Sequence, residues 1–141
     1  MSIAEHAPPY IRAISPYQPG KPITQLAREM GLPVEKIVKL ASNENPLGMS
    51  PRARAAMQAA MDGIERYPDQ FDLTAALAEK FGVGMEQIVL GNGSNDVLDL
   101  AARVFLAPGR SSVFSKHAFA VYPLATMSAG GECIVVPAKH Y

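Results

Sequence analysis

Residues 91–96, Gly-Asn-Gly-Ser-Asn-Asp, have the composition of a phosphate-binding turn. They lie between an expected strand, 87–90, and the start of an expected helix. Unpaired amides at a helix N-terminus point outward, and the helix dipole favours an anion there. The two glycines allow a ligand to approach the backbone closely, and Ser94 adds a hydroxyl donor. The segment matches neither a Walker loop nor a complete GxGxxG fingerprint, and an ordinary turn with Ser94 or Asn95 as the N-cap is the alternative.

Composition and charge exclude several classes of protein. The chain has 141 residues, 48% hydrophobic and 18% charged, with 13 basic and 13 acidic side chains, so its net charge is zero. This balance gives no electrostatic reason to expect a nucleic acid or an acidic membrane as partner. No apolar run approaches the roughly 18–20 residues of a membrane span, and the N-terminus lacks the order of a signal peptide. The lone Cys133 and the absence of Cys/His clusters predict no intrachain disulfide and no metal. We expect a cytoplasmic protein.

Apolar periodicity and turn residues predict an arm followed by alternating helices and strands. Five of the twelve prolines lie within residues 8–22, so this stretch is expected to be extended. Polar residues 41–48 are expected to form a loop. Strands joined by helical crossovers predict parallel pairing with helices on the faces of the sheet. The expected helices are 23–30, ended by Gly31; one starting at Ser50-Pro51 with Ser50 as cap; one capped by Asp72 and ended by Gly82; 97–105; and 122–129; the expected strands are 87–90, 112–115 and 132–136.

Four motifs, taken in order, resemble one family of enzymes. The order and spacing are similar to those of fold-type I aminotransferases, and within them most similar to the histidinol-phosphate aminotransferases. The resemblance extends from about Tyr17 to Tyr141. The motifs are Asn-Glu-Asn-Pro-Leu-Gly at 43–48, Arg-Tyr-Pro-Asp at 66–69, the glycine turn at 91–96 and His-Ala-Phe-Ala-Val-Tyr at 117–122.

The resemblance implies pyridoxal 5'-phosphate (PLP) as cofactor and assigns residues to it. The turn that holds the cofactor phosphate through backbone amides corresponds to Gly93, Ser94 and Asn95. The family usually has an acidic residue where this chain has Asn95; the amide contacts do not depend on that side chain. The aromatic side chain stacked on the pyridine ring corresponds to Phe119, where many relatives have tyrosine, and phenylalanine keeps the stacking face. Tyr67 corresponds to a tyrosine that reaches the cofactor phosphate of the neighbouring subunit.

The resemblance also implies substrate contacts and a homodimer with shared active sites. Asn45 corresponds to the loop that lines the substrate side, and Tyr17 corresponds to an arm residue that approaches substrate across the dimer. From the local sequence alone each residue has a plainer interpretation. Asn45 fits a turn residue that bonds its own backbone, Tyr67 fits a residue at a helix end, and Phe119 fits a core aromatic.

The implied fold is α/β, the N-terminal part of a fold-type I PLP-dependent transferase. We expect an extended arm with a small-domain segment at 1–49, and at 50–141 the first part of a large α/β/α domain with a mostly parallel sheet. In the family the Schiff-base lysine, the acid paired with the pyridine nitrogen and the arginine for the substrate carboxylate lie further along. None of the lysines here has the family's lysine motif, so we expect a fragment, inactive by itself.

The function implied for the intact protein is amino transfer between L-histidinol phosphate and 2-oxoglutarate, a step of histidine biosynthesis. Two alternatives use the same scaffold: an aromatic amino-acid aminotransferase and a phosphothreonine-type decarboxylase. A third, from a different class, is a non-catalytic phosphate-binding module built on the glycine turn. That alternative predicts a chain that folds alone as a stable monomer with a cooperative melt.

Overall fold

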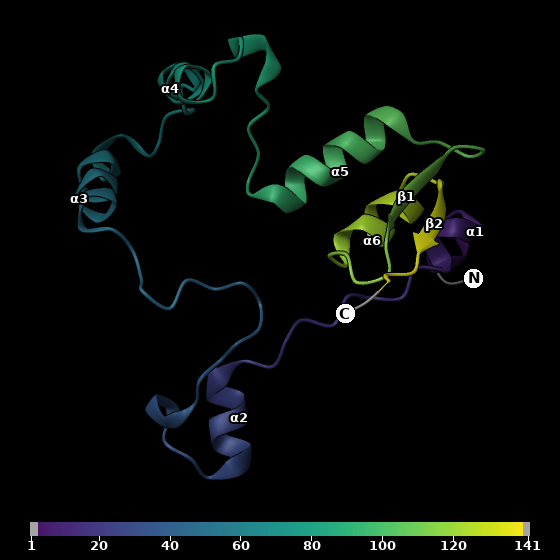
Figure 1. Cartoon of the computed structure of the whole chain (residues 1–141), viewed down its shortest axis with the longest axis horizontal. Coiled ribbons are helices and arrows are strands. Elements are labelled where there is room, and N and C mark those ends of the chain that lie inside the picture. The colour runs from purple at the N-terminus through teal and green to yellow at the C-terminus, as the bar shows by residue number, and fades with distance from the viewer. Residues whose placement is uncertain (1–2, 140–141) are drawn as a thin grey trace. The chain divides into compact units, whose positions relative to one another are not determined.

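A computed structural model describes residues 3–139. Its helices are α1 (Pro9–Arg12), α2 (Ile23–Met30), α3 (Pro51–Ala60), α4 (Phe71–Phe81), α5 (Ser94–Phe105) and α6 (Val121–Ser128), and its strands are β1 (Ser111–Ser115) and β2 (Glu132–Val136) (Figure 1). Short 3-10 turns occur at Ile3–His6, Val34–Lys36, Met61–Gly63 and Met85–Gln87. Within residues 3–139 no helix is long and apolar enough to cross a membrane.

The centre of the α/β part is a β1–α6–β2 unit. The two strands pair in parallel, with Ser111 opposite Glu132 and Ser115 opposite Val136. Helix α6 connects them and contacts both strands, and α5 lies against α6 (Figure 1). Alternate residues of a strand point to opposite faces, so Ser112 and Phe114 are more covered than their neighbours in β1. The expected strands 112–115 and 132–136, the helix between them and their parallel pairing are confirmed.

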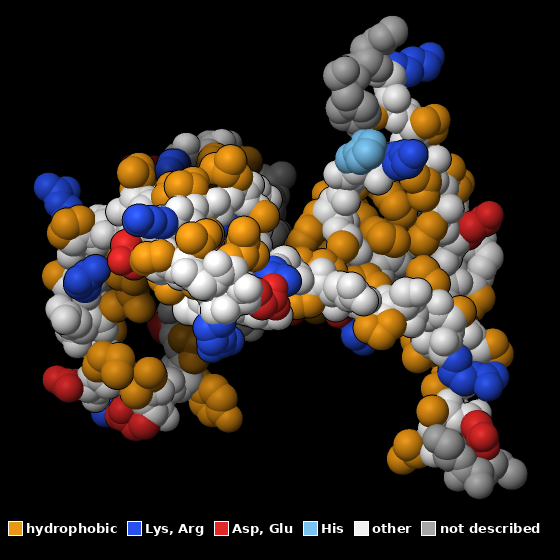
Figure 2. Space-filling view, turned by 90° about the horizontal axis from the view of Figure 1, so that it is seen from below, with side chains coloured by type: hydrophobic (Ala, Val, Ile, Leu, Met, Phe, Trp, Pro, Cys, Tyr) orange, Lys and Arg blue, Asp and Glu red, His pale blue; other side chains and the backbone are white. Residues whose placement is uncertain are grey.

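The buried residues are small. Among the described residues the buried apolar side chains are Ala27, Ala78, Ala102 and Ala125, one each on α2, α4, α5 and α6. Larger apolar side chains remain exposed on many elements, and Figure 2 shows them (orange) over much of the visible surface. An apolar surface of this extent is typical of a face that contacts other protein.

Several helix ends lie where the sequence predicts them. Gly31 and Gly82 both take the left-handed conformation immediately after α2 and α4, as expected for glycine at a helix C-terminus. Helix α3 begins with Pro51, which has the fixed φ that suits the first helical position. Residues 41–48 form the expected loop, without helix or strand.

The structure corrects four local expectations. The expected strand 87–90 is absent: Ile88 is extended, with φ −111° and ψ 127°, but the described sheet contains only β1 and β2, and a strand requires a paired neighbour. The proline-rich arm is not wholly extended, because Pro9 starts the short helix α1 and a proline is tolerated in a first helical turn. The side chain of Ser50 makes no capping hydrogen bond. Asp72 is not a cap, because Gln70 precedes the helix and Asp72 lies in its first turn.

The chain forms two compact units. The first comprises Met1–Tyr17 and Gln70–Tyr141, and the second comprises Gln18–Asp69. The first unit holds the glycine turn and the β1–α6–β2 unit, and the second holds α2, α3 and the loop at 41–48. The division expected from the sequence, at 49/50, concerns the domains of an intact enzyme and stays a prediction.

Candidate functional site

The glycine turn leads directly into α5. Gly93 occupies the N-cap position with φ 84° and ψ 173°, a backbone conformation that favours glycine because it has no Cβ. The Gly93 amide donates to the Gly91 carbonyl at 2.8 Å. The N-cap is therefore the glycine, and neither Ser94 nor Asn95, which are the first two residues of the helix.

The amides at the start of α5 are available to a ligand. The first backbone bond that returns from the helix runs from the Val97 amide to the Gly93 carbonyl, at 3.5 Å. Within residues 3–139 no partner is found for the amides of Ser94, Asn95 and Asp96. A helix of 12 residues that presents free amides at its N-terminus attracts an anion. The geometry therefore fits the phosphate site expected from the sequence.

Gly91 and Asp96 shape the approach to these amides. The Asp96 carboxylate turns back and accepts a hydrogen bond from the Asn92 amide at 3.0 Å. A Cβ on Gly91 would lie 3.0 Å from that carboxylate oxygen and 3.0 Å from a methyl group of Val97, so only glycine fits without displacement. Asn95 is uncharged, so the Asp96 carboxylate is the acidic group in the first turn of α5. The residues present thus fit a phosphate held by amides and by the Ser94 hydroxyl.

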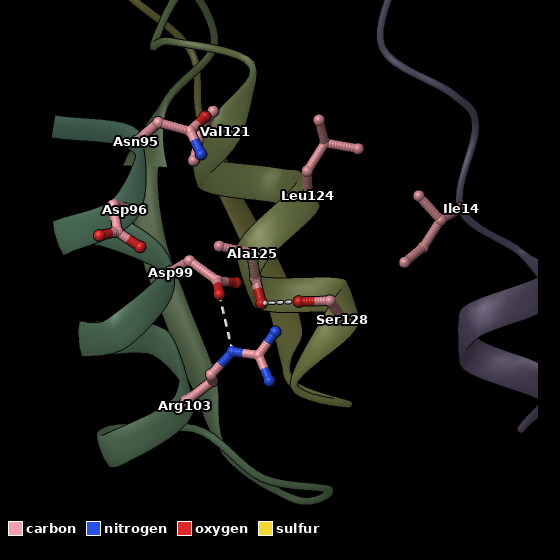
Figure 3. A pocket seen from close by; sticks show the side chains of 9 residues that line it. All are labelled: Ile14, Asn95, Asp96, Asp99, Arg103, Val121, Leu124, Ala125 and Ser128. Atoms are coloured by element: carbon pink, nitrogen blue, oxygen red, sulfur yellow. Dashed lines mark hydrogen bonds and ion pairs between the residues drawn. The ribbon is translucent and has the colours of Figure 1, made fainter. Parts of the chain in front are cut away.

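A groove of about 360 Å³ runs between α5 and α6. Asn95 from the start of α5 and Val121 from the start of α6 lie at the same end of it (Figure 3). Further along, the Arg103 Nε donates to Asp99 at 2.7 Å. The starts of the two helices therefore share one end of the groove, which brings the glycine turn close to the segment that precedes α6.

Phe119 lies in that segment, between β1 and α6. Its carbonyl accepts the Tyr122 amide at 3.0 Å, which fixes the turn into the helix. The Phe119 side chain is 47% exposed, whereas the neighbouring Tyr122 ring packs against Phe114 with centroids 6.0 Å apart. Phe119 is therefore not a core aromatic of the described structure, and its ring is accessible to a ligand.

Asn45 forms a tight local turn in the second unit. Its Nδ2 donates to the Gly48 carbonyl at 2.8 Å, and its Oδ1 accepts the Leu47 amide at 3.0 Å. This is the plainer interpretation considered for this residue, and the two interactions use half of the hydrogen-bonding capacity of the amide. One N–H and one lone pair of Asn45 remain for a ligand.

The two candidate tyrosines are exposed. Tyr67, in the second unit, is fully accessible at 101%. Tyr17, at the end of the arm in the first unit, is 55% exposed. An exposed tyrosine has a free hydroxyl and ring for contact with another molecule.

Three side-chain interactions near these positions are not predicted from the sequence. The Asp99–Arg103 pair has the helical spacing i, i+4, a signal that the sequence does contain. The bond between Ser112 and Thr126, at 2.7 Å, joins β1 to α6. The Lys39–Glu44 pair, at 2.6 Å, spans the start of the loop at 41–48. The last two depend on how the chain turns, so no periodic pattern indicates them.

Comparison with known proteins decides the family. The model of the family described as aminotransferase class I and II matches residues 35–141. The chain belongs to this family. The match includes Asn45, Tyr67, Phe119 and the whole glycine turn, and it accounts for the α/β fold.

Comparison with individual relatives gives a more specific result than the family model. The chain is 77% identical over its whole length to histidinol-phosphate aminotransferase 1 of Dechloromonas aromatica (strain RCB), of which it covers 39%. It is 65% identical to histidinol-phosphate aminotransferase 2 of Nitrosospira multiformis, covering 36% of that protein. The crystal structure of histidinol-phosphate aminotransferase from Sinorhizobium meliloti in complex with pyridoxal-5'-phosphate superposes with a TM-score of 0.77 at 25% identity, over 95% of this chain and 35% of that one. The chain thus spans less than two fifths of these relatives, and its fold is that of part of a PLP-dependent aminotransferase.

Proposed function

We propose that this chain is part of a PLP-dependent aminotransferase that transfers an amino group between L-histidinol phosphate and 2-oxoglutarate, in histidine biosynthesis. The observation that carries the proposal is the 77% identity over the entire chain to a histidinol-phosphate aminotransferase. The free amides at the start of α5 support it independently, because they suit a phosphate group. Bound PLP supplies an aldehyde that takes up the amino group and a ring that withdraws electrons from the substrate α-carbon.

The glycine turn anchors the cofactor in this proposal. The amides of Ser94 and Asn95, with the Ser94 hydroxyl, donate to the cofactor phosphate, and Gly93 sets the backbone angle that aims them. Asn95 lies beside the start of α6 (Figure 3), and Phe119 precedes that helix in the chain, which supports a shared role of the turn and Phe119 in holding the cofactor. The exposed ring of Phe119 would supply a stacking face for the cofactor's pyridine ring.

The remaining candidates act on substrate or across subunits. Asn45 offers its free N–H and lone pair to the substrate, and Tyr17 approaches the substrate from the arm. Tyr67 donates its hydroxyl to the cofactor phosphate of a neighbouring subunit, which makes the active form a homodimer with shared sites. The full exposure of Tyr67 supports this role, because its hydroxyl is accessible to a second molecule. We further propose a cytoplasmic location.

A competition assay with the full-length protein tests the substrate. We expect histidinol phosphate to change the absorbance of bound PLP and to exclude phenylalanine when both are supplied. The reason is that a phosphorylated donor can use a charged contact that phenylalanine lacks. Preference for phenylalanine would indicate an aromatic aminotransferase. Release of carbon dioxide from a phosphorylated amino acid would indicate a decarboxylase, and no absorbance change with any amino donor would refute amino transfer.

A further inference from the structure

The loop that contains Asn45 has an unusual backbone. Ser42 and Asn43 take φ values of 69° and 50°, and among residues 3–139 they are the non-glycine residues with positive φ. Side chains disfavour this left-handed region, although asparagine tolerates it better than most residues. Such a conformation persists only where the surrounding structure holds it, and it occurs often at ligand-binding sites. The interactions that hold this loop are therefore of interest.

An ion pair spans the two consecutive left-handed residues, Ser42 and Asn43. Lys39 lies before them and Glu44 after them, and the Lys39 Nζ is 2.6 Å from the Glu44 carboxylate. The Lys39 side chain is only 16% exposed, whereas Glu44 is 58% exposed. A lysine that is largely covered has fewer alternative positions than one on an open surface, so less side-chain entropy opposes the contact.

Two further contacts hold the same loop. Asn45 bonds to Leu47 and Gly48 and so rigidifies the following turn. On the preceding side the chain passes close to Ser42: a Cβ on Gly20 would lie 3.2 Å from the Ser42 Oγ. The ion pair lies between these contacts, at the point where the backbone is least favourable.

We propose that Lys39 is a positioning residue for the substrate loop. Through Glu44 it holds the left-handed turn, and the turn aims the free N–H and lone pair of Asn45 at the substrate. This inference rests on the proposed function of Asn45. Loss of the ion pair lowers the population of the binding-competent loop, and the apparent affinity for substrate falls by the same fraction.

The chain contains a matched control for this pair. The Lys21 Nζ contacts Glu29 at 2.5 Å, also within the second unit, but both side chains are about half exposed, at 48% and 45%. That contact lowers the pKa of Glu29, with a further hydrogen bond from Gln25. Lys21 lies just before α2 and Glu29 lies on it, and neither residue has a positive φ. Loss of this contact therefore removes a Lys–Glu pair without affecting the left-handed turn.

Steady-state kinetics of the full-length protein test the proposal. We expect Lys39→Met and Glu44→Gln each to raise KM for histidinol phosphate about two- to fivefold, the range of a favourable ion pair with one exposed partner, with little change in kcat. The charge exchange Lys39→Glu with Glu44→Lys should recover most of the loss, and Lys21→Met should leave KM unchanged. An equal effect of Lys21→Met and Lys39→Met would overturn the proposal, as would a fall in kcat alone.

Hydrogen–deuterium exchange gives a second readout that does not depend on activity. In Lys39→Met and in the isosteric Glu44→Gln, the amides of Leu47 and Gly48 should exchange faster than in the unaltered protein, while those of α2 should not. Unchanged exchange at 42–48 would overturn the proposal even in an active enzyme. Conversely, an unaltered protein without amino transfer would refute the proposed function, while faster exchange would still show that Lys39 holds the loop.

Discussion

The backbone conformation of Gly93 favours the binding of an anion at the start of α5. Its φ of 84° turns the chain so that the next amides face outward from α5. Apart from Gly93 and its chain neighbours, no heavy atom of the described residues lies within 4 Å of the position that a Cβ would occupy there, so the requirement for glycine comes from the backbone and not from crowding. A substitution at this position should therefore act through backbone angles alone.

We predict that Gly93→Ala weakens PLP binding by the full-length protein. Alanine disfavours the combination of φ 84° and ψ 173° by about 1–3 kcal/mol, and relaxation of φ would turn the amides of Ser94 and Asn95 away from the phosphate. Fluorescence titration with PLP should show the weaker affinity. Gly109→Ala is the matched control, because Gly109 has φ 87° and an equally open Cβ position but lies beyond the other end of α5. It should also lower stability, because alanine disfavours positive φ, but leave the affinity for PLP unchanged.

Cys133 allows a prediction about pH. Burial is the main cause that raises the pKa of its thiol, and the adjacent Glu132 carboxylate raises it further, against a hydrogen bond with Thr126 that lowers it. The thiolate is the reactive form. Alkylation of the Cys133 peptide by iodoacetamide should therefore require a higher pH in the folded protein than in urea. Peptide mass spectrometry after timed labelling measures the rates.

The raised pKa of Cys133 also makes the stability of the folded protein depend on pH. A folded pKa above the unfolded value means that the folded protein holds the thiol proton more tightly. The stabilisation is fully present below the unfolded pKa and is lost as pH rises through the folded pKa. Cys133→Ser should remove this alkaline component, and identical alkylation profiles in folded and unfolded protein would contradict the assignment.

At the scale of elements, one buried polar side chain joins β1 to α6. The Thr126 hydroxyl is 2.7 Å from the Ser112 hydroxyl and also donates to the Tyr122 carbonyl at 2.7 Å. Thr126 is only 3% exposed, and the Gly131 amide donates to its carbonyl at 2.9 Å. The contact thus ties β1 to the helix that follows Phe119 in the chain.

We predict that Thr126→Val destabilises the full-length protein by about 1 kcal/mol, the usual worth of a hydrogen bond. Valine has nearly the same shape, so the loss reflects the bonds and not a cavity. Thr74→Val is the control: the Thr74 hydroxyl also bonds the carbonyl four residues earlier, that of Gln70, at 2.8 Å, but on an exposed part of α4. Urea unfolding should show a lower midpoint for Thr126→Val only, and equal midpoints would mean that the β1–α6 bond contributes nothing.

At the scale of the whole molecule, the candidate residues are divided between the two compact units. Gly93 and Phe119 belong to the first, and Asn45 and Tyr67 to the second. If Tyr67 completes the site of a neighbouring subunit, then a defect at Tyr67 and a defect at Gly93 damage different sites of a mixed dimer.

Mixing two impaired variants of the full-length protein tests this arrangement. Tyr67→Ala and Gly93→Asp should each have little activity, since one removes the hydroxyl proposed to act across subunits and the other places a carboxylate at the amides proposed to bind phosphate. After denaturation and refolding together, random pairing in a two-fold dimer should restore about a quarter of the normal activity. Gly93→Asp mixed with Phe119→Ala should restore none, because both defects belong to one subunit's own site. Restoration in neither mixture would place Tyr67 in its own subunit's site.

Features that depend on near neighbours in the chain follow from the amino-acid sequence alone. Gly31 and Gly82 end their helices because only a few adjacent bonds decide where a helix stops. The β1–α6–β2 order and its parallel pairing follow from a crossover helix of fitting length. The glycine turn was recognisable because its amides, its glycines and the following helix are contiguous.

Features that depend on partners distant in sequence become apparent only in the folded chain. Residues 88–90 are apolar and Ile88 is extended, but they form no strand because neither described strand pairs with them. The shared end of the groove at Asn95 and Val121 and the Ser112–Thr126 bond arise only when α5, β1 and α6 pack together. The Lys39–Glu44 contact likewise spans two consecutive residues in the left-handed region. These interactions join residues whose separation in sequence carries no periodic signal, so only the folded backbone brings them together.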